Sequence, residues 1–292
     1  MSKQDTVILS EKYKEALAKN KVTFPVCVTE KYDGVLARAV KVGDKIKIYS
    51  RQNNEILSVQ HLNKELENLP LISDSTLIGE LYQPNTNFKD ISGRVRRQSE
   101  QYPECEFKVF DLITPELADK PYKNRLSDLY YMFDNIKSNK ISLVSISRET
   151  FLIAMCNTPE AVMDTYNNFM KANPDAEGVV IRLLNGKNSV YKIGRSYGLL
   201  KLIPEETVDL KVVSLIEGTG NCLGMITAIL VNYKGVDVKV STSSIPHAER
   251  VKMFNNQSDY VGKMMEVKYK TITPAGSLRE PVFKRWRPDR DD

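Results

Sequence analysis

The stretch Val28-Thr29-Glu30-Lys31-Tyr32-Asp33-Gly34 gathers the residues best suited to chemistry. Lys31 follows an apolar run, and strand interiors of this kind carry few charges. A charge cluster at a strand end indicates a site or a turn, and Asp33-Gly34 is also an ordinary turn signal. Because a lysine amine can form covalent intermediates, the stretch is compatible with a nucleophile as well as with a simple turn.

Other short motifs follow that could converge on Lys31: Ser50-Arg51, Gly79-Glu80-Leu81, Phe107 to Asp111, Glu177 to Arg182, and Leu200-Lys201. In order and spacing they resemble the covalent nucleotidyltransferase superfamily, in particular the small viral ATP-dependent DNA ligases of the bacteriophage T7 and Chlorella-virus type. The Lys-x-Asp-Gly nucleophile motif of that family corresponds to Lys31 to Gly34. The resemblance covers the chain from about Thr23 to the C-terminus.

The resemblance implies a reaction in three steps. Lys31 attacks the α-phosphate of ATP, AMP passes from the lysine to the 5′-phosphate of nicked double-stranded DNA, and the 3′-hydroxyl then displaces AMP. Mg²⁺, with Mn²⁺ as a substitute, is the implied metal, and Glu177 is the residue near both metal and lysine. A free lysine has a pKa of about 10.4, so nearby cations (Lys201, Arg195, the metal) would favour its neutral form.

Further roles follow from the resemblance residue by residue. Asp33 and Lys201 complete the catalytic set, with Lys201 on the α-phosphate. The implied nucleotide-binding residues are Thr29, Glu30, Glu80 on the ribose, Phe110 on adenine, Lys192, Arg195 and Arg287. The implied DNA-binding residues are Arg38, Arg51 on the 5′-phosphate, Phe88 on a sugar at the nick, and Arg195. Plainer interpretations remain for three of them: Glu80 as a strand-edge charge, Phe110 as a core residue, and Phe88 as turn packing.

The C-terminal tail PVFKRWRPDRDD resembles the last ligase motif, and Arg287 is its best-placed arginine. It would orient pyrophosphate in the ATP step, which requires the C-terminal domain to close, hinging near Pro204 to Thr207.

Three positions depart from the family pattern. Leu36 stands where an arginine is usual, and Arg38 is two residues further along the same strand face. Ile203 replaces a second lysine after Lys201, and Ile78 replaces an aspartate before Glu80. These departures concern efficiency and substrate preference rather than the reaction class.

The alternating pattern predicts strands at 24–30, 35–42, 45–50, 76–82, 106–113, 178–183 and 189–193. Asp33-Gly34 and Gly43-Asp44 would join the first three as antiparallel neighbours. Helices are expected at 9–20, 58–68, 122–137 and 158–172, and 85–101 as a loop or short helix. Beyond Pro204 the strands shorten (210–217, 224–233, 236–241, 263–272), with a brief helix near 246–254, which favours a small β-barrel.

The expected fold is therefore α+β: an antiparallel-sheet, ATP-grasp-like nucleotidyltransferase domain at 1–206, then an OB-fold at 207–292. Composition is that of an ordinary globular chain: 292 residues, 27% charged, net charge +5. Four separated cysteines and two histidines make a zinc site improbable. We expect a cytoplasmic monomer, or one in a virus-infected host cell, neither secreted nor membrane-bound.

Three alternatives stay open at this stage: an RNA ligase, an mRNA capping guanylyltransferase, and a catalytically silent nucleic-acid-binding module. The Phe283 and Arg287 tail favours a DNA ligase over an RNA ligase, and a capping guanylyltransferase would differ in using GTP and RNA. Intact Lys31, Glu80, Glu177 and Lys201 argue against the third.

Overall fold

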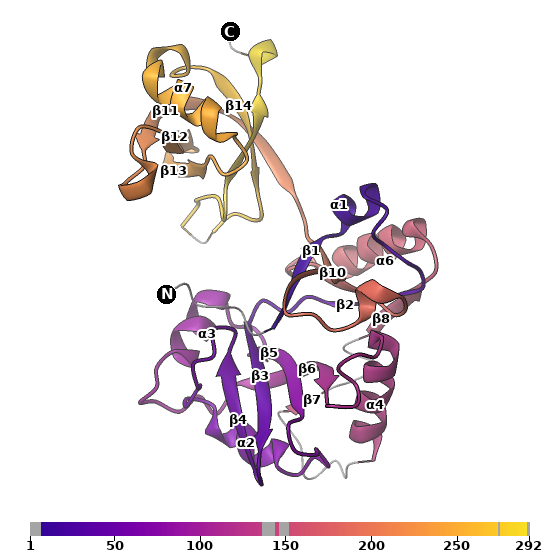
Figure 1. Ribbon diagram of the computed structural model, residues 1–292. Coiled ribbons are helices and arrows are strands. Elements are labelled where there is room, and N and C mark those ends of the chain that lie inside the picture. Colours follow the sequence, from indigo (N-terminus) through magenta and orange to yellow (C-terminus); the bar gives the residue numbers. More distant parts are fainter. Residues whose placement is uncertain (1–6, 136–143, 146–151, 274, 291–292) are drawn as a thin grey trace. The chain divides into compact units, whose positions relative to one another are not determined.

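The chain divides into two compact units, Met1–Leu202 and Ile203–Asp292, shown in the computed structural model of Figure 1. The structure describes residues 7–135, 144–145, 152–273 and 275–290. Each unit has its own hydrophobic core, so each is described separately. Residue 206, where the sequence pattern places the boundary, is the first residue of the long strand β11 (Glu206–Glu217), whereas the compact units divide between Leu202 and Ile203.

The first sheet of the N-terminal unit has the order β1 (Ile8–Lys12), β10 (Gly194–Leu202), β9 (Val179–Leu183), β2 (Val26–Glu30), β8 (Leu152–Cys156). β1 pairs in parallel with β10, and the other neighbours are antiparallel. One face, with Val28 and Ile181, packs against α1 (Tyr13–Ala18) and α6 (Pro159–Ala172). Since side chains alternate along a strand, Thr29, Arg182 and Lys201 belong to the opposite face.

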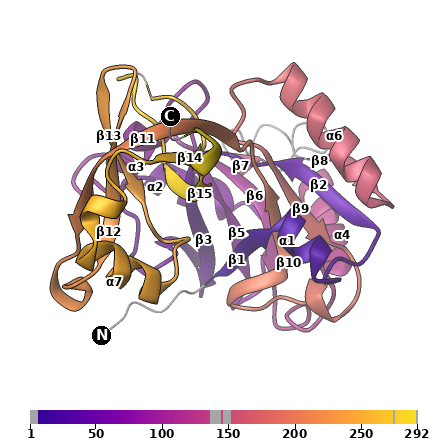
Figure 2. The ribbon, with the colours of Figure 1, turned by 90° about the horizontal axis from the view of Figure 1, so that it is seen from above.

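The second sheet has the order β4 (Lys45–Ser50), β3 (Val35–Val42), β5 (Thr76–Tyr82), β6 (Glu106–Ile113), β7 (Val144–Ser145). Its Ala37 and Leu77 face packs on α2 (Gln60–Leu66) and α3 (Phe88–Val95). The helix α4 (Tyr122–Asp134) contributes to this core and to a cluster with Cys27 of the first sheet, so it ties the two sheets together (Figures 1 and 2).

The C-terminal unit is a closed barrel in the order β11, β12 (Ile226–Tyr233), β13 (Val236–Ser241), β15 (Val282–Trp286), β14 (Met264–Tyr269). Val212, Ile229, Val240 and Val267 fill its interior, and Met253 of α7 (His247–Asn255) joins the same core. The predicted small barrel is confirmed, and β15 adds a strand that the sequence pattern did not indicate.

Three sequence-based predictions about elements are wrong. Residues 8–12 are strand rather than helix, because their backbone pairs with β10. Residues 189–193 precede β10 and form no strand. Asp33-Gly34 is no hairpin turn, since β2 and β3 lie in different sheets. The expected helix at 122–137 ends at Asp134, and residues 136–137 lie outside the described part of the chain.

Candidate active site

Lys31 lies where the chain crosses from the first sheet to the second, directly after β2. Its backbone N–H donates to the Gly178 carbonyl at 3.0 Å, which continues the pairing of β2 with β9. Its Nζ lies 2.7 Å from Oε2 of Glu177, and both side chains are mostly buried (24% and 11% exposed). The strand pairing thus brings together an amine and a carboxylate that are 146 residues apart.

A steric constraint explains why a glycine stands at position 34. A Cβ at Gly34 would come within 2.3 Å of the Leu81 carbonyl oxygen and 2.8 Å of Glu80 Cγ. Only a residue without a side chain lets β5 approach the crossing this closely. Glu80 is therefore held next to the nucleophile motif, and the Gly34 N–H donates to it.

Glu80 is the carboxyl group most affected by this closeness. Burial raises its pKa to about 8; the charge of Lys31 lowers it, and Glu177 and Asp33 raise it again. Lys31, Asp33, Glu80 and Glu177 therefore form one electrostatic cluster. Next to the nucleophile, burial also raises the pKa of Glu30, against the opposing charge of Lys108.

Phe110 lies between the two sheets. It is 8% exposed and packs with Val7 and Ile78. The Arg182 guanidinium lies 4.4 Å from the centre of its ring. Arg182 also donates to Oγ1 of the fully buried Thr29 at 3.2 Å. Phe110, expected on adenine, and Thr29, expected to contact the nucleotide, thus share one layer between the sheets with Arg182.

A buried ion pair fixes the backbone that carries Phe110. Arg125 of α4 donates to Asp111 through Nε at 2.8 Å and Nη2 at 3.0 Å, and both side chains are at most 4% exposed. The hydroxyl of Tyr122 donates to the Phe110 carbonyl at 2.8 Å. Bidentate pairs of this kind hold geometry well, so the first turn of α4 sets the position of the ring.

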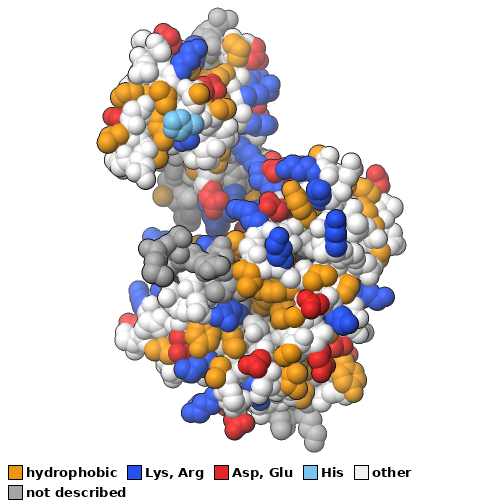
Figure 3. Space-filling model, in the orientation of Figure 1, with side chains coloured by type: hydrophobic (Ala, Val, Ile, Leu, Met, Phe, Trp, Pro, Cys, Tyr) orange, Lys and Arg blue, Asp and Glu red, His pale blue; other side chains and the backbone are white. Residues whose placement is uncertain are grey.

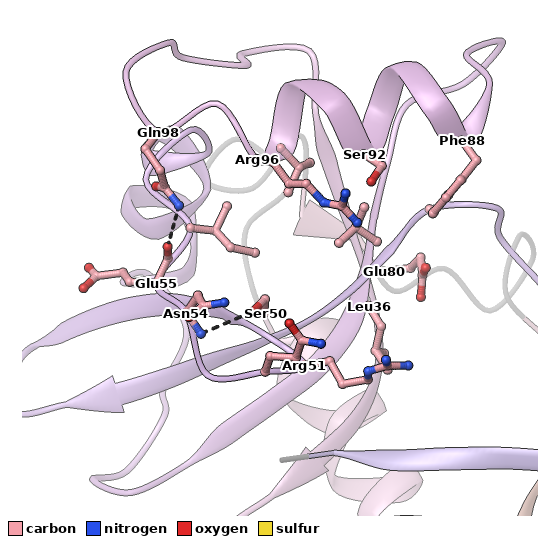
Figure 4. Close-up of a pocket in the computed structure, with 15 residues that line it drawn as sticks. Leu36, Ser50, Arg51, Asn54, Glu55, Glu80, Phe88, Ser92, Arg96 and Gln98 are labelled. Atoms are coloured by element: carbon pink, nitrogen blue, oxygen red, sulfur yellow. Dashed lines mark hydrogen bonds between the residues drawn. The ribbon is translucent and has the colours of Figure 1, made fainter. Parts of the chain in front are cut away.

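An open cavity of about 750 Å³ begins at Gly34 and Glu80 and extends between the β4 end and α3. Figure 4 shows Arg51 and Leu36 on one wall, and on the other Phe88 and Ser92 of α3 with Arg96 directly after the helix. Of the sequence-predicted DNA-binding residues, Arg51 and Phe88 therefore line the same cavity as the predicted ribose ligand Glu80.

The departures at Leu36 and Ile78 turn out to be neighbours. Leu36 pairs with Glu80 and Ile78 with Arg38 across β3 and β5, and both apolar side chains pack in the cluster that contains Phe110. An arginine at 36 and an aspartate at 78 would lie diagonally across the same two strands. The apolar pair Leu36 and Ile78 thus replaces both the arginine and the aspartate of the family pattern, so that neither charge is present without the other.

Arg38 is held within the second sheet. Its Nη2 donates to Oδ1 of Asn53, and its guanidinium lies 5.1 Å from the Tyr49 ring centre. Asn53 belongs to the turn that carries Arg51, and its N–H donates to the Ser50 carbonyl. Arg38 therefore contacts the turn that carries Arg51.

The remaining predicted cations are Lys201, Lys192, Arg195 and Arg287. Lys201 is half-buried on the inner face of β10, aligned with Val180. Lys192 and Arg195 are exposed, and Arg195 donates to the Ser10 carbonyl of β1 at 3.1 Å. Arg287 belongs to the C-terminal unit, where it pairs with Asp209 at 3.3 Å and Asp289 at 3.0 Å. The hydrogen bond to Asp289 raises the pKa of Arg287, and the charges of Asp209, Asp289 and Glu266 raise it further.

Sequence reasoning gave no role to three residues that shape the site: Arg182, Arg125 and Tyr122. Arg182 left a signal, since it is a charge inside the apolar run GVVIR. Arg125 left none, because charges are ordinary on a surface helix. The sequence also predicts that the basic cluster Arg94, Arg96 and Arg97 binds DNA electrostatically, but the three side chains differ: Arg94 pairs with Glu104 at 2.7 Å, Arg97 pairs with Glu100 at 3.2 Å, and of the three Arg96 alone lines the cavity.

Within the described ranges, no three His, Cys, Asp or Glu side chains are grouped so as to hold a metal ion. None of the helices described there is long and apolar enough to cross a membrane. On the face seen in Figure 3, basic and acidic side chains are interspersed.

A lysine beside a carboxylate at the crossing of two sheets, followed by a closed five-stranded barrel, defines a covalent nucleotidyltransferase with an OB-like unit. Residues 8–202 match the ATP dependent DNA ligase domain, and residues 217–287 match the DNA ligase OB-like domain. The chain belongs to the ATP-dependent DNA ligase family.

Individual relatives agree with this assignment. The chain is 28% identical over 276 residues to the DNA ligase of African swine fever virus (isolate Tick/South Africa/Pretoriuskop Pr4/1996), covering 87% of this chain but only 64% of that ligase. A solved Lig E DNA ligase has a TM-score of 0.73 at 22% identity, covering 97% of this chain and 99% of that one. The Chlorella virus DNA ligase-adenylate gives 0.53 at 25%, covering 97% and 98%.

Proposed function

We propose that this protein is an ATP-dependent DNA ligase that seals nicks in duplex DNA through a lysine–AMP intermediate. The observation that carries the proposal is the Lys31–Glu177 contact of 2.7 Å in one electrostatic cluster with Glu80, which lines a cavity together with Arg51 and Phe88. Nucleophile, nucleotide ligand and DNA ligands then act from one continuous site. The chain covers only 64% of the length of the African swine fever virus ligase. The nick-sealing activity is therefore a proposal for this chain.

In the first step the neutral Lys31 amine attacks the α-phosphorus of ATP. An N–P bond forms, the bond to pyrophosphate breaks, and the lysine proton is lost. Glu177, within hydrogen-bonding distance of Nζ, is placed to orient the amine and to take up its proton. Lys201 supplies positive charge to the α-phosphate, and Arg287 supplies it to the pyrophosphate as that group leaves.

The nucleotide would bind between Glu80 and the layer formed by Phe110, Thr29 and Arg182. A carboxyl oxygen of Glu80 accepts from the ribose hydroxyls, and the ring of Phe110 offers a face to adenine. Glu30 lies beside this set, and Lys192 and Arg195 complete the phosphate contacts.

The carboxylates present fit Mg²⁺, with Mn²⁺ as a substitute. Mg²⁺ typically binds one or two carboxylates together with substrate phosphates and water, which agrees with a site lacking a dedicated group of three ligating side chains in the described ranges. Glu177, with 11% of its side chain exposed, would hold it. When bound, the ion neutralises charge on the phosphates.

The cavity would take the nick. Arg51 binds the 5′-phosphate that receives AMP, Phe88 packs on a sugar, and Arg195 adds positive charge near the backbone. Arg38 contributes to DNA binding through Asn53, in the turn that carries Arg51. We infer that the protein acts as a monomer in the cytoplasm, of a host cell if its origin is viral.

The test is sealing of a singly nicked, labelled duplex with ATP and Mg²⁺, with DNA or RNA on each side of the nick. Sealing of all-DNA nicks with a labelled enzyme–AMP adduct is the expected result. Sealing restricted to RNA strands would identify an RNA ligase. Adduct formation with GTP instead of ATP would identify a capping enzyme. Absence of any adduct would refute the proposed chemistry.

A further inference from the structure

The α3 wall of the cavity contains an arginine to which the proposed function gives no role. Phe88, Ser92 and Arg96 follow one another at intervals of four residues, so they share one side of the helix. All three line the cavity (Figure 4). Phe88 begins α3 and Arg96 follows its last residue. Eight residues of helix separate their backbones by about 12 Å.

Arg96 differs from the two arginines beside it. Arg94 is fixed by Glu104 and by the Tyr102 ring, whose centre is 3.8 Å from its guanidinium. Arg97 pairs with Glu100. Arg96 forms no ion pair with any residue that the structure describes, and its side chain is exposed to the cavity.

We propose that Arg96 binds an internal backbone phosphate of the nicked DNA, across the cavity from Arg51; this rests on the proposed ligase function. Two guanidinium groups lie on opposite walls of the cavity, and arginine's planar fork matches a phosphate group. Of the two carboxyl groups that line the same cavity, Glu55 pairs with Lys47 at 3.2 Å, and burial raises the pKa of Glu80 to about 8. The phosphate is internal because the terminal 5′-phosphate must approach Lys31, near Glu80 and Phe88, whereas Arg96 lies at the other end of α3.

The first experiment compares Arg96→Ala with Arg97→Ala, its exposed neighbour. Binding of singly nicked duplex is measured over a series of salt concentrations, together with formation of the lysine–AMP adduct. For Arg96→Ala we expect about tenfold weaker binding at low salt and a salt slope smaller by about 0.9, with normal adduct formation. Arg97→Ala should match the wild type in all three. Equal behaviour of the two variants would overturn the proposal.

The second experiment identifies the phosphate. Single methylphosphonate substitutions, which remove one backbone charge at a time, are placed along both strands around the nick. A methylphosphonate at one internal position should weaken DNA binding by the wild type, and the same substitution should not weaken binding by Arg96→Ala. The assignment is refuted if Arg96→Ala loses its sensitivity to methylphosphonates only at the terminal 5′-phosphate, or at no position. A defect of Arg96→Ala in adduct formation would also refute it, because that result would place Arg96 on ATP. Arg96→Lys should restore part of the salt slope.

These outcomes are distinct from failure of the proposed function. If wild type forms no adduct and seals no nick, the ligase assignment fails. If wild type seals nicks and Arg96→Ala binds with an unchanged salt slope, only the role of Arg96 fails. Because Arg96 is exposed, its replacement should leave the thermal unfolding midpoint unchanged, and a measured midpoint confirms that the variant is folded.

Discussion

The Nζ of Lys31 lies 2.7 Å from Oε2 of Glu177, and the Lys31 N–H donates to the carbonyl of Gly178, the residue after Glu177. The lysine is thus fixed at its backbone and at its tip by adjacent residues. Lys31→Ala should abolish the covalent AMP adduct, because no other group would occupy the nucleophile position. The measurement is transfer of label from α-labelled ATP, read on a denaturing gel. Lys14→Ala, on the exposed side of α1, should label normally; an adduct in Lys31→Ala would disprove the assignment.

The close approach at Gly34 gives a prediction about stability. Gly34→Ala would place a Cβ 2.3 Å from the Leu81 carbonyl oxygen, so β5 or the crossing must shift. We expect a loss of about 1–3 kcal/mol in unfolding free energy and a large loss of adduct formation. Denaturant unfolding measures the first effect.

The matched control is Gly93→Ala in α3, where an added Cβ would meet nothing within 4 Å. A helix gains about 0.5–1 kcal/mol from this exchange, so the two variants should change stability in opposite directions. Equal destabilisation by both would contradict the steric account of Gly34.

Glu80 predicts a pH dependence of stability. Its pKa is raised from 4.5 to about 8 by burial, so between these values the folded state binds more protons than the unfolded state. Stability should therefore fall as pH rises through this window. Relative to Glu80→Gln, wild type should lose up to about 1.4 kcal/mol per pH unit between pH 5 and 8, measured by urea unfolding at several pH values. Glu116→Gln, at an exposed position, should follow wild type; a pH-independent difference for Glu80→Gln would refute the prediction.

The sequence could predict the elements whose pattern is local. The strands that contain Glu80 and Phe110, the helix α6 and the barrel were all predictable, because alternation, helical periodicity and turn residues are properties of short stretches. The family motifs also located Lys31, Glu80 and Glu177 in the chain. Their contact could not be predicted from local pattern, since it depends on the pairing of β2 with β9.

Two errors show where local reasoning fails. Asp33-Gly34 has the composition of a hairpin turn, yet it leads from one sheet to another, because β2 finds its partners in β8 and β9. Residues 8–12 have a helical pattern, but pairing with β10 outweighs a weak propensity in so short a segment. For the same reason the sequence could not separate Arg96 from Arg94 and Arg97: the difference lies in Glu104, Glu100 and the cavity.

Arg287 leads to a prediction that separates the reaction steps. Charge develops on pyrophosphate only during adenylation, so a cation directed at that leaving group stabilises only that transition state. Arg287→Ala should reduce adduct formation at least tenfold more than single-turnover sealing of nicks that already carry AMP. Arg290→Ala is the control for loss of an ion pair with Asp209, because Arg290 also pairs with that residue, at 2.6 Å. An equal loss in both assays for Arg287→Ala would mean that the residue serves folding or DNA binding.

Arg38 and Asn53 allow a test of indirect action. The guanidinium of Arg38 donates to Asn53 in the turn that carries Arg51, so we expect Arg38 to position Arg51. Arg38→Ala and Asn53→Ala should each slow sealing of pre-adenylated nicks by roughly tenfold, as expected for loss of a charge-assisted hydrogen bond, and leave adduct formation unchanged. The double variant Arg38→Ala/Arg51→Ala should be no slower than Arg51→Ala alone, because coupled residues are not additive. Lys47→Ala, in β4 of the same sheet, should seal normally. Additive losses, or normal sealing by Asn53→Ala, would show instead that Arg38 contacts DNA directly.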